Sequence, residues 1–120
     1  MDIVYIKELR VQTVIGIFEW ERNIRQEVCI DLEMATDVKR AAANDRIEDA
    51  LDYKSVSKRL IEFVESSEFF LVETLAEKIA GIVLEEFKVP WLRLQLGKPG
   101  AVRGAKDVGI LIERGDRGAS

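Results

Sequence analysis

The first part of the chain alternates between apolar and polar residues, a pattern that predicts β-strands. Over residues 2–15 the apolar positions change parity near Glu8, so this run predicts a long strand with a bulge. A later run keeps a strict two-residue period, and its apolar members are Val28, Ile30, Leu32 and Met34. Gly16 and the segment 17–23, which has no period, predict a loop between the two strands. We therefore expect a long antiparallel hairpin.

The middle of the chain shows the three-to-four-residue spacing of amphipathic helices. Asp52 stands at the N-cap position of a helix predicted over residues 53–65, and a second helix is predicted over residues 72–87. Before them, the Ala-rich segment 39–45 predicts a helical turn, and residues 47–51 a connection. Each long helix has one apolar stripe, which needs a sheet to cover it.

The last part returns to alternation. Leu92, Leu94 and Leu96 predict a third strand ending near Lys98, and residues 107–113 predict a fourth. The order is two strands, two helices and two strands, which indicates an α+β fold with a four-stranded antiparallel sheet and both helices on one face.

A single layer of this kind leaves one sheet face and two strand edges open, and such surfaces are usually protected by association. We therefore expect a homo-oligomer. The 120 residues have room for one domain, predicted over residues 1–115, followed by a flexible tail over residues 116–120.

The amino-acid composition disfavours several classes of function. Eighteen basic residues stand against 22 acidic ones, so the chain lacks the basic excess typical of nucleic-acid-binding proteins. It has no histidine, which disfavours zinc sites and catalysis by Ser/His/Asp or Cys/His, and no metal or cofactor is expected. Cys29 is the single cysteine, so no intramolecular disulfide is possible. No run is long enough for a membrane span, and residues 1–10 are unlike a signal peptide, which favours a cytoplasmic location.

Four polar residues are candidates for a site, and each also has an ordinary structural explanation. Glu21 is typical of a solvated loop carboxylate or of a ligand acceptor beside aromatic residues. Tyr53, at a helix entry, is typical of a packing residue or of a proton relay. Glu73 lies where a carboxylate stabilises a helix dipole, or where it accepts paired N–H donors. Lys98 is either an exposed strand-end lysine or a desolvated acid–base group. Composition and spacing leave these alternatives open.

Four pieces of sequence, taken in order, resemble one family. They are MDIVYIKELRVQTVIGIFEWE, ALDYKSV, FFLVETLAEKIA and LGKPGAVRGAKDVGILIERG. Together they resemble the bacterial dihydroneopterin aldolases of folate biosynthesis from Met1 to about Gly115. The resemblance implies the tunnelling fold, in which four subunits join their sheets into a barrel and two rings stack into an octamer with active sites at subunit interfaces.

The resemblance also implies a reaction. These enzymes cleave 7,8-dihydroneopterin into 6-hydroxymethyl-7,8-dihydropterin and glycolaldehyde, and many epimerise the side chain at C2'. The N5=C6 imine of the substrate accepts the electrons of the broken carbon–carbon bond, so neither a Schiff base nor a metal is needed. A chain without histidine is compatible with that chemistry.

Pterin binding is implied for three neighbouring residues. Glu73, in the LVE piece, matches the carboxylate that accepts two parallel hydrogen bonds from N3–H and the 2-amino group of the pterin. The backbone at Leu71 and Val72 is expected to bind the same ring.

Catalytic roles are implied for three further residues. Lys98, in GKPG, matches the lysine that delivers a proton towards N5 and stabilises negative charge. Tyr53, in LDY, matches the tyrosine that reaches a neighbouring subunit's site and moves protons there. Glu21 matches the glutamate that binds the side chain of the substrate and shapes the proton network.

Two positions differ from the family pattern. Gly16 is followed by Ile17 and Phe18, where many relatives have His or Tyr, so contacts of the first loop are not transferred. Gly97 precedes the lysine, which predicts looser positioning of Lys98.

Two other functions compete with the aldolase. One is dihydroneopterin triphosphate 2'-epimerase, a sister enzyme that shares the fold and the stretch resembling NDRIEDALDYKSVSK, although the carboxyl-terminal piece is aldolase-like. The other is a catalytically silent pterin-binding oligomer, against which the four matched site residues argue.

Overall fold

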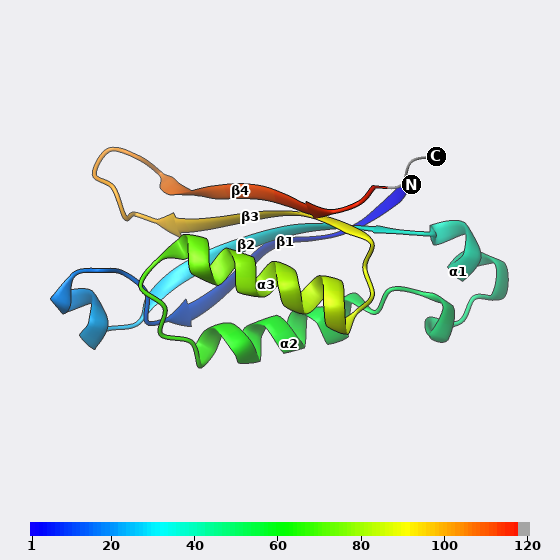
Figure 1. The fold of residues 1–120 in the computed structure, drawn as a ribbon, viewed down its shortest axis with the longest axis horizontal. Coiled ribbons are helices and arrows are strands. Elements are labelled where there is room, and N and C mark those ends of the chain that lie inside the picture. The colour runs from blue at the N-terminus through cyan, green and yellow to red at the C-terminus, as the bar shows by residue number, and fades with distance from the viewer. Residues whose placement is uncertain (118–120) are drawn as a thin grey trace.

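The computed structural model describes residues 1–117, which form a four-stranded antiparallel sheet with two long helices on one face (Figure 1). The strands lie side by side in chain order: β1 (Asp2–Thr13), β2 (Gln26–Thr36), β3 (Trp91–Pro99) and β4 (Asp107–Gly115). The helices are α1 (Val38–Asn44), α2 (Tyr53–Glu65) and α3 (Val72–Glu86), with two short 3₁₀ helices, η1 (Glu19–Asn23) and η2 (Ile47–Asp49). This arrangement confirms the predicted α+β fold.

The predicted bulge in the first strand is present. The pairing of β1 with β2 shifts between Ile6 and Leu9, and Glu8 adopts a left-handed conformation with φ of 55°. The Glu8 N–H, turned out of the strand ladder, donates a 2.8 Å hydrogen bond to Asp31 Oδ1. The Asp31 side chain therefore replaces the backbone acceptor that the Glu8 N–H loses at the bulge.

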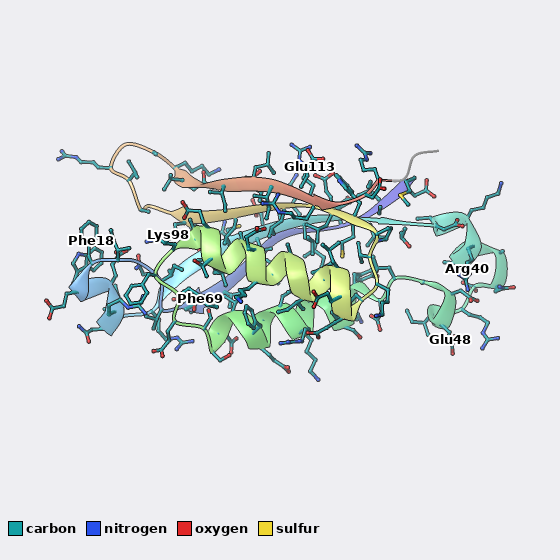
Figure 2. The ribbon with its side chains drawn as sticks, viewed as in Figure 1. Phe18, Arg40, Glu48, Phe69, Lys98 and Glu113 are labelled. Atoms are coloured by element: carbon teal, nitrogen blue, oxygen red, sulfur yellow. The ribbon has the colours of Figure 1, made fainter. Side chains whose placement is uncertain are left out.

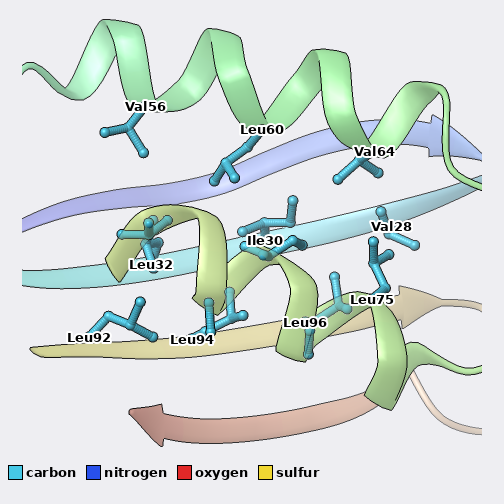
Figure 3. Packing of buried hydrophobic residues seen from close by; sticks show 14 of the residues in the cluster. Val28, Ile30, Leu32, Val56, Leu60, Val64, Leu75, Leu92, Leu94 and Leu96 are labelled. Carbon is cyan, nitrogen blue, oxygen red and sulfur yellow. The ribbon is translucent and has the colours of Figure 1, made fainter. Parts of the chain in front are cut away.

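The core lies between the helices and the inner face of the sheet (Figure 3). The stripe of α2 consists of Val56, Leu60 and Val64, all fully buried. α2 lies against β1, and α3 lies against β3 and β4 with its own buried stripe of Leu75, Ala76, Ile79, Ala80 and Val83. Both stripes join one core cluster with the inward-facing residues of β2 and β3, which are Val28, Ile30, Leu32, Met34, Leu92, Leu94 and Leu96. Each such side chain contributes roughly 1.5–3 kcal/mol to the stability of the fold when it is fully buried. The inward-facing apolar residues predicted from the alternation therefore hold the helices on the sheet.

The connections contain more structure than the sequence predicted. β1 ends at Thr13, two residues early, because the hydroxyl of Thr13 is buried against Ser67 and the chain then turns away. The segment 17–23, expected to be a plain loop, contains η1, and the connection 47–51 contains η2. Both are short 3₁₀ helices held by local backbone hydrogen bonds, which leave no periodic signal in the sequence.

Two described residues of the expected tail contact the beginning of β3. The Asp116 N–H donates to the Pro90 carbonyl at 2.8 Å, and the Arg117 guanidinium lies 4.5 Å from the centre of the Trp91 ring. The rest of that tail, residues 118–120, lies outside the described residues. Within residues 1–117, no helix has the length and apolar character needed to cross a membrane.

Candidate active site

A cavity of about 350 Å³ lies at the end of the sheet where β1 leads into η1, α3 begins and β3 ends. Figure 2 shows Phe18 and Lys98 at this end of the molecule and Arg40 and Glu48 at the opposite end. The lining residues used below are Gly16, Glu21, Gln26, Phe70, Leu71, Val72, Glu73 and Lys98. Three separate stretches of the chain carry these residues, and Val108 of β4 adds a fourth part of the lining.

Glu21 is the buried acid of this cavity, with 5% of the residue exposed. Its carboxylate accepts hydrogen bonds from Lys98 Nζ at 2.8 Å, Gln26 Nε2 at 3.0 Å and the Phe18 N–H at 3.2 Å. Burial raises the pKa of Glu21, but these three donors outweigh it and bring the pKa from 4.5 to about 2. Glu21 is therefore a fixed anion, and its interpretation as a solvated loop carboxylate is wrong.

Gly16 makes room for this anion. Its backbone has φ of 127°, and a Cβ atom at this position would collide with the carboxyl group of Glu21. Only glycine combines that conformation with the absence of a side chain. The turn that ends β1 and the burial of Glu21 thus depend on the same residue.

Lys98 lies at the end of β3 with 15% of its side chain exposed, and it forms the ion pair with Glu21. It is therefore largely buried rather than an ordinary exposed lysine. The preceding Gly97 was expected to loosen it, but Asp107 Oδ2 fills the space beside Gly97, 2.9 Å from where a Cβ would lie. The lysine is thus held by a paired strand and by a buried counter-ion.

Glu73 lies on the wall formed by the first turn of α3, as predicted. The residue is exposed, and no other group among residues 1–117 forms a hydrogen bond or ion pair with its carboxylate. Leu71, the N-cap residue, provides no side-chain cap, so N–H groups of the first helical turn remain available beside Val72 and Glu73. This wall offers a free carboxylate together with backbone polar groups.

Tyr53 is the one predicted site residue that the chain does not bring to the cavity. It is the first residue of α2, is 55% exposed, and is absent from the cavity lining. The cavity lies beyond the other end of this 13-residue helix, which spans about 20 Å. Within one chain, the structure brings Glu21, Glu73 and Lys98 together and leaves Tyr53 apart.

Sequence reasoning missed three polar or aromatic residues at the cavity. Gln26 holds Glu21 and also donates to the Ile15 carbonyl at 2.8 Å. Arg22 lies behind the cavity wall and stacks on Phe70, with 4.0 Å between its guanidinium carbon and the ring centre. A glutamine at a strand start, an arginine in a short 3₁₀ helix and a phenylalanine before α3 have no distinctive spacing, so only the folded arrangement reveals them.

Comparison with known proteins connects this cavity to a family. The profile of the family described as FolB, dihydroneopterin aldolase, matches residues 4–113. The chain belongs to the dihydroneopterin aldolase family. The match includes every wall of the cavity and confirms the resemblance read from the four sequence pieces.

The relatives agree along almost the whole chain. The dihydroneopterin aldolase of Escherichia coli K12 is 45% identical over 97% of this chain and 95% of its own. Its crystal structure in complex with neopterin has a TM-score of 0.94 and covers 96% of this chain and 100% of that one. The crystal structure of FolB from Vibrio cholerae has a TM-score of 0.95 at 48% identity, covering 97% of this chain and 98% of the other.

The sister activity is also represented among the relatives. The dihydroneopterin triphosphate 2'-epimerase of Escherichia coli K12 is 34% identical over 92% of this chain and 92% of its own. Similarity is therefore greater to the aldolase than to the epimerase, which agrees with the aldolase-like carboxyl-terminal piece.

Proposed function

We propose that this chain is a 7,8-dihydroneopterin aldolase, which cleaves its substrate into 6-hydroxymethyl-7,8-dihydropterin and glycolaldehyde for tetrahydrofolate biosynthesis. The observation that carries the proposal is the cavity itself. One wall holds the buried Lys98–Glu21 pair, and another presents the unpartnered Glu73 carboxylate beside the start of α3. Membership of the aldolase family supports the same reaction.

Glu73 binds the pterin ring in this proposal. Its free carboxylate accepts two parallel hydrogen bonds from N3–H and the 2-amino group, a planar arrangement that suits two carboxylate oxygens. Backbone groups at Leu71 and Val72 bind the same ring. The exposed, uncommitted state of Glu73 supports this role, because no internal partner has to be displaced first.

Lys98 and Glu21 serve the cleavage step. The C2' hydroxyl loses its proton, the C1'–C2' bond breaks to release glycolaldehyde, and the electron pair of that bond passes to the N5=C6 imine. Lys98 delivers a proton towards N5 and stabilises the developing charge, and Glu21 binds the substrate side chain. The low pKa of Glu21 supports its role as an acceptor of hydroxyl hydrogen bonds throughout the neutral range.

Tyr53 completes the site from a neighbouring subunit. It moves protons at the substrate hydroxyl and at the enamine carbon that becomes the hydroxymethyl group. Its position at the far end of α2 from its own cavity supports a role in another copy's site. The exposed apolar residues at the cavity end support coverage by a second chain, and they are Ile17, Phe18, Trp20, Phe70 and Leu71.

The assembly proposed is an octamer of two stacked tetrameric rings. β1 and β4 are the outer strands of the sheet, so each leaves one edge unpaired within the chain. Pairing β1 of one copy with β4 of the next would join four sheets into a barrel and remove both edges. A cytoplasmic location is part of the proposal, in keeping with a lone cysteine and no disulfide.

Epimerisation at C2' is proposed as a side activity. Cleavage is chemically reversible, so the enamine can attack the other face of glycolaldehyde before it leaves, which gives 7,8-dihydromonapterin. The same groups serve both outcomes, and no additional residue is required.

Anaerobic incubation of the purified protein with 7,8-dihydroneopterin, and separately with its triphosphate, tests the proposal. Products are followed by liquid chromatography and mass spectrometry. Glycolaldehyde and 6-hydroxymethyl-7,8-dihydropterin from the unphosphorylated substrate are expected. Epimer formed only from the triphosphate would instead identify the sister activity, and pterin binding without turnover would identify a silent binding protein.

A further inference from the structure

Arg22 joins two loops that form different walls of the cavity. Its Nη1 donates to the Gly16 carbonyl at 2.9 Å and to the Phe69 carbonyl at 3.0 Å, and its Nη2 donates to the Glu68 carbonyl. Its guanidinium also stacks on the ring of Phe70 at 4.0 Å. One side chain thus connects the turn after β1 with the loop between α2 and α3.

The residues that Arg22 holds are next to those proposed to bind and cleave the substrate. Gly16 lines the cavity and is the residue whose missing side chain admits the Glu21 carboxylate. On the other side, Phe69 and Phe70 lead directly into Leu71 and the first turn of α3, which carries Glu73. Arg22 therefore links the wall that holds Glu21 to the wall that carries Glu73, and the distance between these walls depends on its hydrogen bonds.

Arginine is suited to this connection in a way that lysine is not. Its planar guanidinium has five N–H donors in a fixed fork, so it satisfies three carbonyl acceptors and still presents a flat face to an aromatic ring. A lysine ammonium can replace one or two of these hydrogen bonds but not the stacking of a planar group. The half-buried position of Arg22 keeps the fork partly away from competing water.

We propose that Arg22 is a positioning residue for the aldolase reaction, and this inference rests on the proposed function. By fixing the turn at Gly16 against the segment that carries Phe70 and Leu71, it sets the spacing at which a pterin bound to Glu73 presents its side chain to Lys98. Arg22 does not touch the reacting atoms in this account. It acts through the walls that it connects.

Arg25 provides a matched control within the same region. Its Nη2 donates to the carbonyls of Gln12 and Glu65, so it also connects the end of β1 with the end of α2 through backbone acceptors. Neither acceptor lines the cavity, and Arg25 itself does not. Loss of a loop connection in general should affect both arginines, whereas loss of substrate positioning should affect Arg22 alone.

The experiment compares Arg22→Gln, Arg22→Lys and Arg25→Gln with the wild-type protein. It measures kcat and KM for 7,8-dihydroneopterin, the Kd of 6-hydroxymethylpterin by fluorescence titration, and the melting temperature. We expect Arg22→Gln to lower kcat/KM by tenfold or more, since small misplacements of bound substrate are costly, with weaker pterin binding. Arg22→Lys should show a smaller loss in the same direction, and Arg25→Gln should keep wild-type kinetics.

The inference is overturned if the two Gln variants have the same kinetic constants while both remain folded, or if Arg22→Lys matches the wild type. A wild-type protein that neither binds nor converts the pterin would overturn the proposed function itself, which is a separate result read from the unmutated chain. If Arg22→Gln does not fold, the comparison of Arg22→Lys with the wild type still decides the question.

Discussion

Glu21 shows how a single carboxylate is kept ionised in a nearly closed environment. Removing a carboxylate from water favours its neutral form, and three hydrogen-bond donors, one of them the Lys98 ammonium, are needed to reverse that preference. The lysine is 77 residues away in the chain, so no local pattern announces the pair. This is why the residue pattern left both interpretations of Glu21 open until the family resemblance was considered, and why its burial could not be predicted.

Acid should unfold the protein partly through Glu21. Because the folded-state pKa of about 2 lies below the ordinary 4.5, the stability that Glu21 contributes is complete above about pH 4.5 and is lost as the pH falls towards 2. The size of this contribution is roughly 3 kcal/mol. Urea unfolding from pH 7 to pH 2 measures the free energy of unfolding of the wild type and of Glu21→Gln. The difference between the two proteins should shrink as the pH falls from 4.5 towards 2. Glu19→Gln, an exposed neighbour in η1, should not change the acid dependence in this way.

Binding and turnover should separate between two residues of the cavity. Lys98→Ala should lower kcat by about a hundredfold or more, the usual cost of removing an acid–base group, while pterin affinity changes little. Glu73→Ala should weaken pterin binding by roughly two orders of magnitude, because two hydrogen bonds to a charged acceptor are lost. Steady-state kinetics and fluorescence titration with 6-hydroxymethylpterin measure both effects. Wild-type turnover in Lys98→Ala would contradict the role assigned to that lysine.

At the scale of elements, the sequence predicted best where the determining interactions are local. The bounds of α2 were predicted correctly, since Asp52 caps the helix through the Ser55 N–H and the apolar stripe repeats within the helix itself. The bulge at Glu8 was visible as a change of parity in β1. η1 was missed, because a short 3₁₀ helix held by local backbone hydrogen bonds has no apolar repeat, and the burial of its Glu21 depends on Gly16 and Lys98 outside the helix.

The turn after β1 should be intolerant of any side chain at Gly16. Gly16→Ala places a methyl group against the Glu21 carboxyl and imposes φ of 127° on an alanine, so we expect a stability loss of about 1–3 kcal/mol and at least tenfold lower turnover. Gly104→Ala is the control, because Gly104 also has a positive φ of 89° but open space around it. Chemical denaturation and steady-state kinetics distinguish the two. Equal turnover in both variants would show that backbone strain alone, and not displacement of Glu21, explains the effect.

At the scale of the whole molecule, one chain measures 51 × 26 × 22 Å and carries proposed catalytic groups at both ends. The cavity with Lys98 is at one end, and Tyr53 begins the helix whose other end approaches that cavity. The sequence predicted association from the open face and edges of the sheet, but it did not by itself show that Tyr53 is separated from its own cavity. The separation becomes visible only when the position of α2 on the sheet is known, and that position is set by packing in the core.

Mixed assemblies should recover activity that neither parent has. With the proposed roles, Lys98→Ala and Tyr53→Phe should each damage every site when present alone. When the two variants are unfolded and refolded together, some sites combine an intact Lys98 from one chain with an intact Tyr53 from another. We expect the specific activity of the mixture to exceed the mean of the two parents. A mixture that stays at this mean, although mass measurements show that mixed oligomers have formed, would place Tyr53 outside the neighbour's site.

The length of α2 acquires a meaning beyond packing when the two ends of this helix serve different sites. The 13 residues of α2 set the distance between Tyr53 at one end of the helix and the cavity near its other end in every copy. One additional helical turn would shift this distance by about 5.4 Å while leaving both ends locally intact. In the proposed ring, an insertion that an isolated domain tolerates would move Tyr53 away from the neighbour's cavity. The spacing between Asp52 and Ser67 would then matter for function as much as the identity of any side chain in the cavity.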